Sequence, residues 1–191
     1  MTSNHKKYNS KNPIQQFLIS RFLQSISGLA SEINAKTLLD IGSGEGFVLK
    51  AILRNNNFQA IALDPNENAL IELKKRLPNV QVKSGYIQNL PYKDNSFDLV
   101  VCCEVLEHLK EPKLALKEIK RVGKNYIISV PNEPWFSHMN LMRGRHVSNF
   151  GCHPEHIQKW STKKFVELVG NDLKIIKIKQ SFPWTIVLAI K

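Results

Sequence analysis

Short apolar runs alternate along the chain with segments in which apolar residues recur every three or four positions. The first pattern is typical of buried strands and the second of amphipathic helices. Their regular alternation predicts parallel strands joined by right-handed helical crossovers, with helices on both faces of one sheet. We expect strands at 37–41, 58–63, 80–84, 97–102 and 125–130, and helices at 46–55, 66–76 and 112–121.

The N-terminal segment predicts a helix that covers the sheet. Asn12 is a suitable N-cap and Pro13 a suitable first helical residue, and apolar residues follow at helical spacing. We expect this helix at about 13–27, with its end near Gly28.

The C-terminal part predicts a closing hairpin. Ser161 caps a helix that is expected to run to about residue 169, and two apolar runs follow it at 173–179 and 184–190. Two consecutive strands at the end of an alternating chain indicate one antiparallel strand. The expected fold is therefore α/β, a single domain over residues 1–191 with a mostly parallel seven-stranded sheet.

One long irregular stretch, at about 131–160, separates the fifth strand from the last helix. Stretches of this length in a compact domain are usually functional. This one also follows the carboxyl end of a strand, which is the edge where open α/β sheets bind ligands. We expect it to form a lid at about 131–160 beside the ligand site.

Three glycines at alternate positions follow the first expected strand and lead into a helix: Gly42, Gly44 and Gly46. Glycines let a ligand approach the backbone closely, and the amides at the helix start point to the same place. Asp40 precedes this loop, and Ser43 and Glu45 lie within it. Two carboxylates would repel a pyrophosphate, whereas they suit a ligand with an ammonium and a sulfonium group. S-adenosylmethionine is such a ligand.

A second acidic position follows the next expected strand at Asp64-Pro65. An acid about 20 residues after a glycine loop can accept both hydroxyls of a ribose. By itself this acid fits NAD and S-adenosylmethionine equally well.

The blocks around these positions, within residues 37–109, resemble the class I S-adenosylmethionine-dependent methyltransferases. The resemblance is to the small soluble subgroup that includes the ubiquinone- and menaquinone-pathway enzymes. It implies that Tyr8 can touch the cofactor. Tyr86 stands where many relatives carry an Asp that binds adenine, so stacking by Tyr86 or the backbone of Ile87 would have to read the base. The cofactor-binding residues that the resemblance implies are Asp40, Gly42, Ser43, Gly44, Asp64, Pro65, Tyr86, Ile87 and Glu104.

Histidines are the candidate catalytic residues, because methyl transfer requires an aligned acceptor and sometimes a base. His153 and His156 are the best placed, since several relatives carry a His at the point in the lid where His156 stands. The alternative is that His156 only fixes the loop by hydrogen bonds. We assign no metal ligand. The competing interpretation takes Glu104, Glu107 and His108 as one face of a helix, which resembles, together with His156, the metal site of small-RNA 3′-end 2′-O-methyltransferases.

The charge distribution does not determine which class of molecule is methylated. The net charge is +11; residues 1–109 hold 12 basic and 10 acidic side chains, and residues 110–191 hold 15 basic and 6 acidic ones. This surplus could attract nucleic acid, anionic lipid or an acidic small molecule, or be a solvated lysine-rich surface. We favour a methyltransferase for a small, apolar or quinone-like molecule. The alternatives are an RNA methyltransferase acting on a 2′-hydroxyl, and a non-catalytic protein that binds S-adenosylmethionine or NAD.

The expected location is the cytoplasm. Three cysteines, of which Cys102 and Cys103 are adjacent in a strand, form no disulfide framework. The N-terminus lacks the apolar core of a signal peptide, and the apolar run at 184–190 is too short to span a bilayer.

Overall fold

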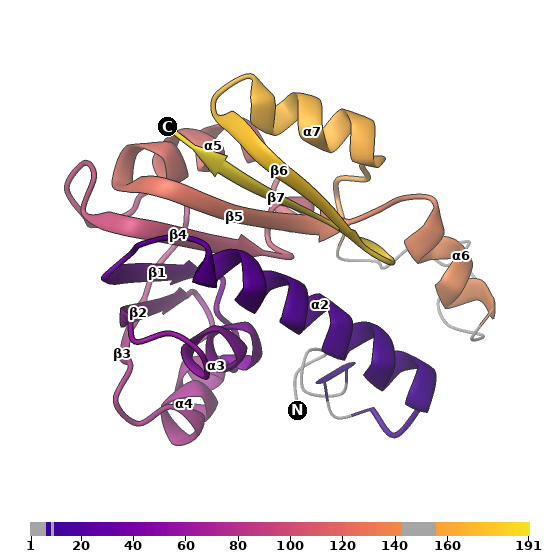
Figure 1. Ribbon diagram of the computed structural model, residues 1–191, viewed down its shortest axis with the longest axis horizontal. Coiled ribbons are helices and arrows are strands. Elements are labelled where there is room, and N and C mark those ends of the chain that lie inside the picture. Colours follow the sequence, from indigo (N-terminus) through magenta and orange to yellow (C-terminus); the bar gives the residue numbers. More distant parts are fainter. Residues whose placement is uncertain (1–6, 9, 143–155) are drawn as a thin grey trace.

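The computed structural model describes residues 7, 8, 10–142 and 156–191. Seven strands of this part form one sheet in the order β3-β2-β1-β4-β5-β7-β6 (Figure 1). Strand β7 pairs antiparallel with both of its neighbours, and the other pairings are parallel. The predicted fold, with a mostly parallel sheet and one antiparallel strand, is confirmed. The strands are β1 (Thr37–Ile41), β2 (Gln59–Asp64), β3 (Gln81–Ser84), β4 (Phe97–Cys103), β5 (Gly123–Pro131), β6 (Lys174–Ser181) and β7 (Trp184–Ile190).

Helices cover both faces of the sheet (Figure 1). Apolar side chains of α2, α3 and α4 pack on one face, and those of α5 and α7 pack on the other. A single 3-10 turn, η1, follows β4. The helical elements are α2 (Pro13–Ser31), α3 (Phe47–Leu53), α4 (Glu67–Arg76), η1 (Leu106–His108), α5 (Pro112–Val122), α6 (Trp135–Met142) and α7 (Thr162–Gly170).

The central strands β1, β4 and β5 are mostly apolar because both of their faces are buried. Successive side chains of a strand point to opposite faces. Leu38 therefore joins the core under α2 while Leu39 joins the core under α5, and Val101 and Cys102 divide in the same way. This explains why the central strands read as continuous apolar runs rather than as alternating ones.

The first long helix differs from its prediction at its end. Helix α2 ends at Ser31 and not near Gly28. Leu29 and Ala30 are completely or almost completely buried. Burial of these two side chains outweighs the low helix propensity of Gly28, since tertiary packing commonly overrides propensity.

The stretch at 131–160 is not irregular throughout, as the sequence had suggested. Helix α6 occupies Trp135–Met142, and residues 143–155 lie outside the described part. The two ends of the excursion meet: Asn132 forms an isolated bridge with Trp160, and the Glu133 N–H donates to the Trp160 carbonyl at 2.9 Å. The stretch therefore has a closed base at the carboxyl end of β5, and its role as a lid stays a prediction.

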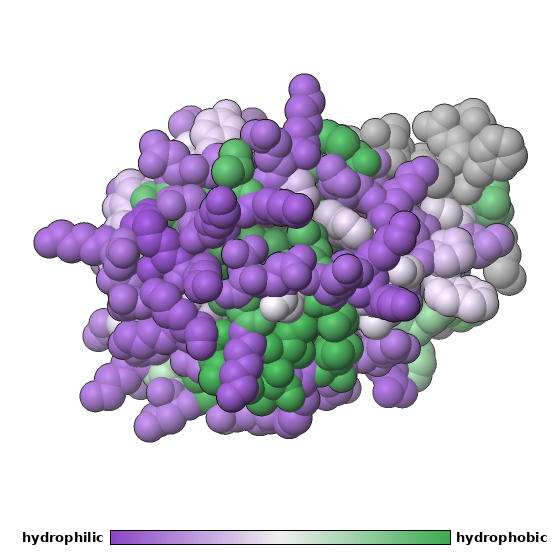
Figure 2. Space-filling view, turned by 90° about the horizontal axis from the view of Figure 1, so that it is seen from above, coloured by the Kyte–Doolittle hydropathy of each residue, from purple (hydrophilic) through white to green (hydrophobic). Residues whose placement is uncertain are grey.

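Strand β6 forms one edge of the sheet and is exposed along most of its length. Its side chains include the exposed residues Lys174, Lys177 and Lys179. Lysines on an edge strand discourage pairing with another sheet. The molecule seen from above is mostly hydrophilic, with one hydrophobic area in the lower centre of the view (Figure 2). None of the helices in the described ranges combines the length and the apolarity needed to cross a bilayer.

Candidate active site

The site lies where the strand order reverses. Strands β1 and β4 are neighbours at the centre of the sheet, with Ile41 paired to Cys102. Connections on either side of such a point leave in opposite directions, which opens a crevice at the carboxyl ends of the strands. The glycine loop after β1 and Glu104 after β4 both begin at this crevice.

The glycine loop takes a conformation that other residues rarely adopt. Gly42, Gly44 and Gly46 have φ values of 68°, 51° and 78°, in the left-handed region that favours glycine. A Cβ at Gly42 would also overlap Cγ2 of Val105, which follows β4. The glycines thus let the loop after β1 pack directly against the segment after β4.

Asp64 holds the glycine loop in place from the end of β2. Its Oδ2 accepts a hydrogen bond from the Gly44 N–H at 2.8 Å, and its Oδ1 accepts one from the Asn66 N–H at 2.8 Å. Burial raises the pKa of Asp64, although these two bonds act to lower it. A carboxylate has about four lone-pair directions, so two remain for donors of a ligand.

Asp40 is a buried carboxylate with an unsatisfied oxygen. Its side chain is 2% exposed, and Oδ2 has no hydrogen-bond partner. Burial, followed by the charge of Asp64, raises the pKa of Asp40 to about 8. The buried Ser43 hydroxyl also lacks a partner. Orphaned buried acceptors are costly, so this part of the loop suits a ligand that brings donors and positive charge.

Glu104 lines the crevice and has an unfavourable backbone conformation. Its φ is 57°, which is uncommon for a non-glycine residue and is often found at functional sites. Its carboxylate accepts hydrogen bonds from the Lys7 ammonium and from Nε1 of Trp184, the latter at 2.7 Å. The left-handed turn directs Glu104 toward the N-terminal segment and away from η1.

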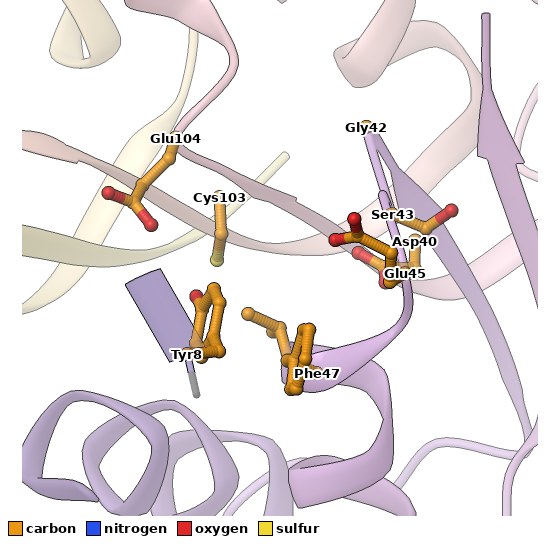
Figure 3. A pocket seen from close by; sticks show the side chains of 9 residues that line it. Tyr8, Asp40, Gly42, Ser43, Glu45, Phe47, Cys103 and Glu104 are labelled. Atoms are coloured by element: carbon orange, nitrogen blue, oxygen red, sulfur yellow. The ribbon is translucent and has the colours of Figure 1, made fainter. Parts of the chain in front are cut away.

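Two residues of the N-terminal segment, Lys7 and Tyr8, occupy the crevice. Figure 3 shows the Tyr8 ring between Glu104 on one side and the group of Asp40, Ser43 and Glu45 on the other. The Tyr8 ring stacks on Phe47, with the centroids 4.5 Å apart. The space that remains is about 40 Å³, whereas sites for small-molecule ligands usually measure about 300–1,000 Å³. A cofactor can therefore enter only if this segment moves.

We expect that replacing Lys7 by Met speeds cofactor entry. The Lys7 ammonium lies 4.9 Å from the Trp184 ring and pairs with Glu104, where it takes the place of a cationic ligand. Loss of this pair should raise the association rate and the affinity for S-adenosylhomocysteine by up to about tenfold, the equivalent of one charge-assisted hydrogen bond. Stopped-flow fluorescence would measure the rates, with Lys11→Met as the control. Equal rates in the wild type and in Lys7→Met would show that the segment does not limit entry.

The structure brings only some of the predicted cofactor residues into this pocket. Asp40, Gly42, Ser43 and Glu104 line it, and Gly44 is joined to Asp64 by the hydrogen bond described above. Gly44 and Asp64 themselves are not lining residues, and neither are the remaining three: Pro65 is exposed, Tyr86 is 68% exposed and Ile87 is 5% exposed.

Sequence reasoning missed two aromatic residues of the site. Phe47 lines the pocket and Trp184 binds Glu104. Phe47 directly follows the glycine loop, which could have indicated it. No local signal points to Trp184, because only the sheet order brings the start of β7 to this place.

A larger hollow of about 620 Å³ lies at the opposite edge of the sheet, where β1, β2 and β3 begin. Thr37, Gln59 and Gln81 are among its lining residues, and no ionisable side chain is. Size alone would favour this hollow as the site. Two features argue against that choice: the lining has no ionisable side chain, and the hollow lies at the amino ends of the strands, whereas open α/β sheets bind ligands at the carboxyl ends.

Comparison with known proteins identifies the family. A sequence model described as a methyltransferase domain matches residues 39–126. A protein of Mycobacterium tuberculosis, "Probable S-adenosylmethionine-dependent methyltransferase", is 31% identical over 130 residues, which cover 65% of this chain and 46% of that protein. Over these residues the chain is similar to S-adenosylmethionine-dependent methyltransferases. The cofactor of this family is S-adenosylmethionine, and the orphaned Asp40 carboxylate fits its cationic end.

Two further comparisons extend this picture. The demethylmenaquinone methyltransferase of Thermotoga maritima is 27% identical over 121 residues, which cover 62% of this chain and 53% of that protein. The magnesium protoporphyrin IX methyltransferase of Synechocystis, solved with bound SAH, shares the fold at a TM-score of 0.72 and 13% identity, over 98% of this chain and 92% of its own. The chain spans about half the length of the curated relatives it matches.

One of the two candidate catalytic residues, His156, lies beside η1. His156 is half-buried, and its ring centroid lies 5.0 Å from that of His108. His153 falls outside the described residues. The predicted helix face of Glu104, Glu107 and His108 is wrong: the helical turn comprises only Leu106–His108, and Glu104 belongs to the cofactor crevice.

Proposed function

We propose that this chain transfers a methyl group from S-adenosylmethionine to a small-molecule acceptor. The observation that supports it best is the buried Asp40 carboxylate, which has an oxygen without a partner and lies in a crevice also lined by Glu45 and Glu104. Three acidic side chains at a glycine loop would repel the pyrophosphate of a dinucleotide. They would stabilise an ammonium and a sulfonium group.

The proposed roles follow the order of the strands. Asp40 and the loop residues Gly42, Ser43 and Gly44 would hold the methionine end, and Glu104 would lie near the sulfonium. Asp64 would accept the ribose hydroxyls through the lone pairs that Gly44 and Asn66 leave available. Pro65, Tyr86 and Ile87 would border the adenine, since they follow the carboxyl ends of β2 and β3.

The chemistry itself requires little from the protein. When bound, the cofactor supplies a methyl group that accepts an electron pair from the acceptor while the C–S bond breaks and its electrons remain on sulfur, giving S-adenosylhomocysteine. The protein has to align the acceptor and exclude water. We assign activation of the acceptor to His156, and His153 stays a prediction. Only Val105 separates Glu104 from η1, and the Ile157 N–H donates to the Glu107 carbonyl at 2.8 Å, so the segment of His156 is attached next to the residue that borders the cofactor crevice.

His156→Ala is expected to abolish most of the methyl transfer and leave cofactor binding intact. Loss of a group that activates the acceptor commonly costs about 10²–10⁴-fold in rate. The test uses cofactor with a labelled methyl group on small-molecule, lipid and RNA fractions, and His138→Ala on α6 is the matched control. Label in the small-molecule fraction, lost in His156→Ala, supports the proposal. Label confined to RNA, or equal transfer by His156→Ala, would contradict it.

A further inference from the structure

Three potential metal ligands converge beside η1, outside the cofactor crevice. Glu107, His108 and His156 each offer a ligand atom, and these atoms all lie within 4.8 Å of one another. Glu107 and His108 belong to η1, and His156 comes from the segment that returns from the lid. Two distant parts of the chain therefore supply one compact set of a carboxylate and two imidazoles.

The Glu107 carboxylate is the most unusual member of this set. Its residue is 1% exposed, and neither of its oxygens has a hydrogen-bond partner. A buried carboxylate is normally paired or hydrogen-bonded, because taking it out of water without compensation is costly. The imidazoles of His108 and His156 lie beside the Glu107 carboxylate. A cation bound by all three groups would compensate the burial of this carboxylate.

Backbone hydrogen bonds fix the position of His156 relative to Glu107. The N–H groups of Ile157 and Gln158 both donate to the Glu107 carbonyl, at 2.8 and 3.0 Å. The Gln158 side-chain amide also donates to the Leu109 carbonyl at 3.2 Å. The segment after the lid is thus attached to η1 at several points, so the three ligand groups are held together by the fold.

We propose that Glu107, His108 and His156 bind a divalent transition-metal ion. Two imidazoles and one carboxylate suit Mn²⁺, Fe²⁺, Co²⁺ or Zn²⁺, whereas Mg²⁺ and Ca²⁺ prefer oxygen ligands alone. Three protein ligands leave at least one coordination position open. Glu104 takes no part, since its carboxylate is engaged by Lys7 and Trp184.

The ion identifies the class of acceptor, and this step rests on the proposed function. An ion held by these residues would lower the pKa of a hydroxyl at its open position, and the hydroxyl proton would pass to water. The hydroxyl oxygen would supply the electron pair for the bond to the methyl carbon as the C–S bond breaks. The expected acceptor is therefore a hydroxyl compound that becomes O-methylated. His156 acts on it as a ligand of the ion.

Metal binding can be measured without turnover. Protein stripped with a chelator is titrated with Co²⁺, Mn²⁺, Zn²⁺ and, for comparison, Mg²⁺, by calorimetry and by the visible absorption of Co²⁺. We expect one site per chain, with Mg²⁺ the weakest of the four ions. In Glu107→Gln and His156→Ala the affinity should fall by about 100-fold or more, because even groups behind the ligands contribute about 10–100-fold. His138→Ala should bind as the wild type does.

Thermal unfolding shows whether the variants fold and gives a second readout. Metal should raise the melting temperature of the wild type and of His138→Ala, and not that of Glu107→Gln. Absence of saturable binding in the wild type, or equal binding in Glu107→Gln and His156→Ala, would overturn the proposal. Titration of the same samples with S-adenosylhomocysteine separates this outcome from a failure of the proposed function. If the protein binds the cofactor but no metal, the metal-site proposal is refuted and the proposed function is not.

Discussion

Asp40→Asn is expected to lose most of its affinity for S-adenosylmethionine while the protein without cofactor becomes more stable at alkaline pH. The carboxylate oxygen that lacks a partner is available for the cofactor's ammonium group. A charge-assisted hydrogen bond of this kind is worth about 1.5–3 kcal/mol. The affinity should therefore fall by roughly 10–100-fold. Calorimetry with wild type and variant at pH 9, where Asp40 is ionised, measures this difference most clearly.

The stability effect follows from the raised pKa of Asp40, from an ordinary 3.8 to about 8. The folded protein binds this proton more tightly than the unfolded chain, so its contribution to stability is complete below about pH 4 and is lost as the pH rises through 8. Asp40→Asn does not titrate. At pH 9 the free energy of unfolding of Asp40→Asn should exceed that of the wild type by on the order of 2–5 kcal/mol, and at pH 5 the difference should be much smaller. Urea unfolding at both values measures the difference, and a constant difference would contradict the burial of Asp40.

Cofactor binding should depend on pH in the same range. A cationic ligand selects the ionised form of Asp40, so binding below pH 8 must release a proton. The affinity of the wild type should rise with pH up to about 8 and then level off. Asp40→Asn should show little of this dependence.

Asp64→Ala should impair both the cofactor site and the loop that forms it. The mutation leaves the Gly44 N–H without its acceptor and removes the proposed partner of the ribose hydroxyls. Each loss costs on the order of 1–3 kcal/mol, the first in stability and the second in cofactor affinity. Asp64→Asn keeps one acceptor oxygen and should lie between the wild type and Asp64→Ala.

Calorimetry with S-adenosylhomocysteine and chemical unfolding measure the two effects of Asp64→Ala separately. Reduced stability with unchanged affinity would show that Asp64 only supports the loop and that the ribose is bound elsewhere.

The sheet could be predicted from the sequence because each strand and each turn has its own local signal. Each central strand is an apolar run of the right length, and glycines such as Gly42 mark the turn after the first. Features that depend on distant contacts could not be predicted. The end of α2 is set by burial of Leu29 and Ala30, and the pairing of Trp184 with Glu104 depends on the order of strands in the sheet.

One interpretation of the sequence was wrong at the end of β4. A helical spacing rule placed Glu104 and Glu107 on one face, but Glu104 takes a left-handed conformation and lines the crevice, whereas Glu107 lies beside His108 and His156. The pattern Glu-x-x-Glu-His contains no signal for this backbone turn. It arises because Glu104 contacts the N-terminal segment and β7, and neither is close in sequence.

The central claim, a site for a cationic adenosyl cofactor at Asp40 and the glycine loop, is tested most directly by comparing ligands on the whole protein. Calorimetry at pH 8 with S-adenosylmethionine, S-adenosylhomocysteine and NAD should show one site for each of the first two and none for NAD. Asp40→Asn should weaken the first two. Binding of NAD to the wild type, with no heat from either adenosyl ligand, would contradict the claim.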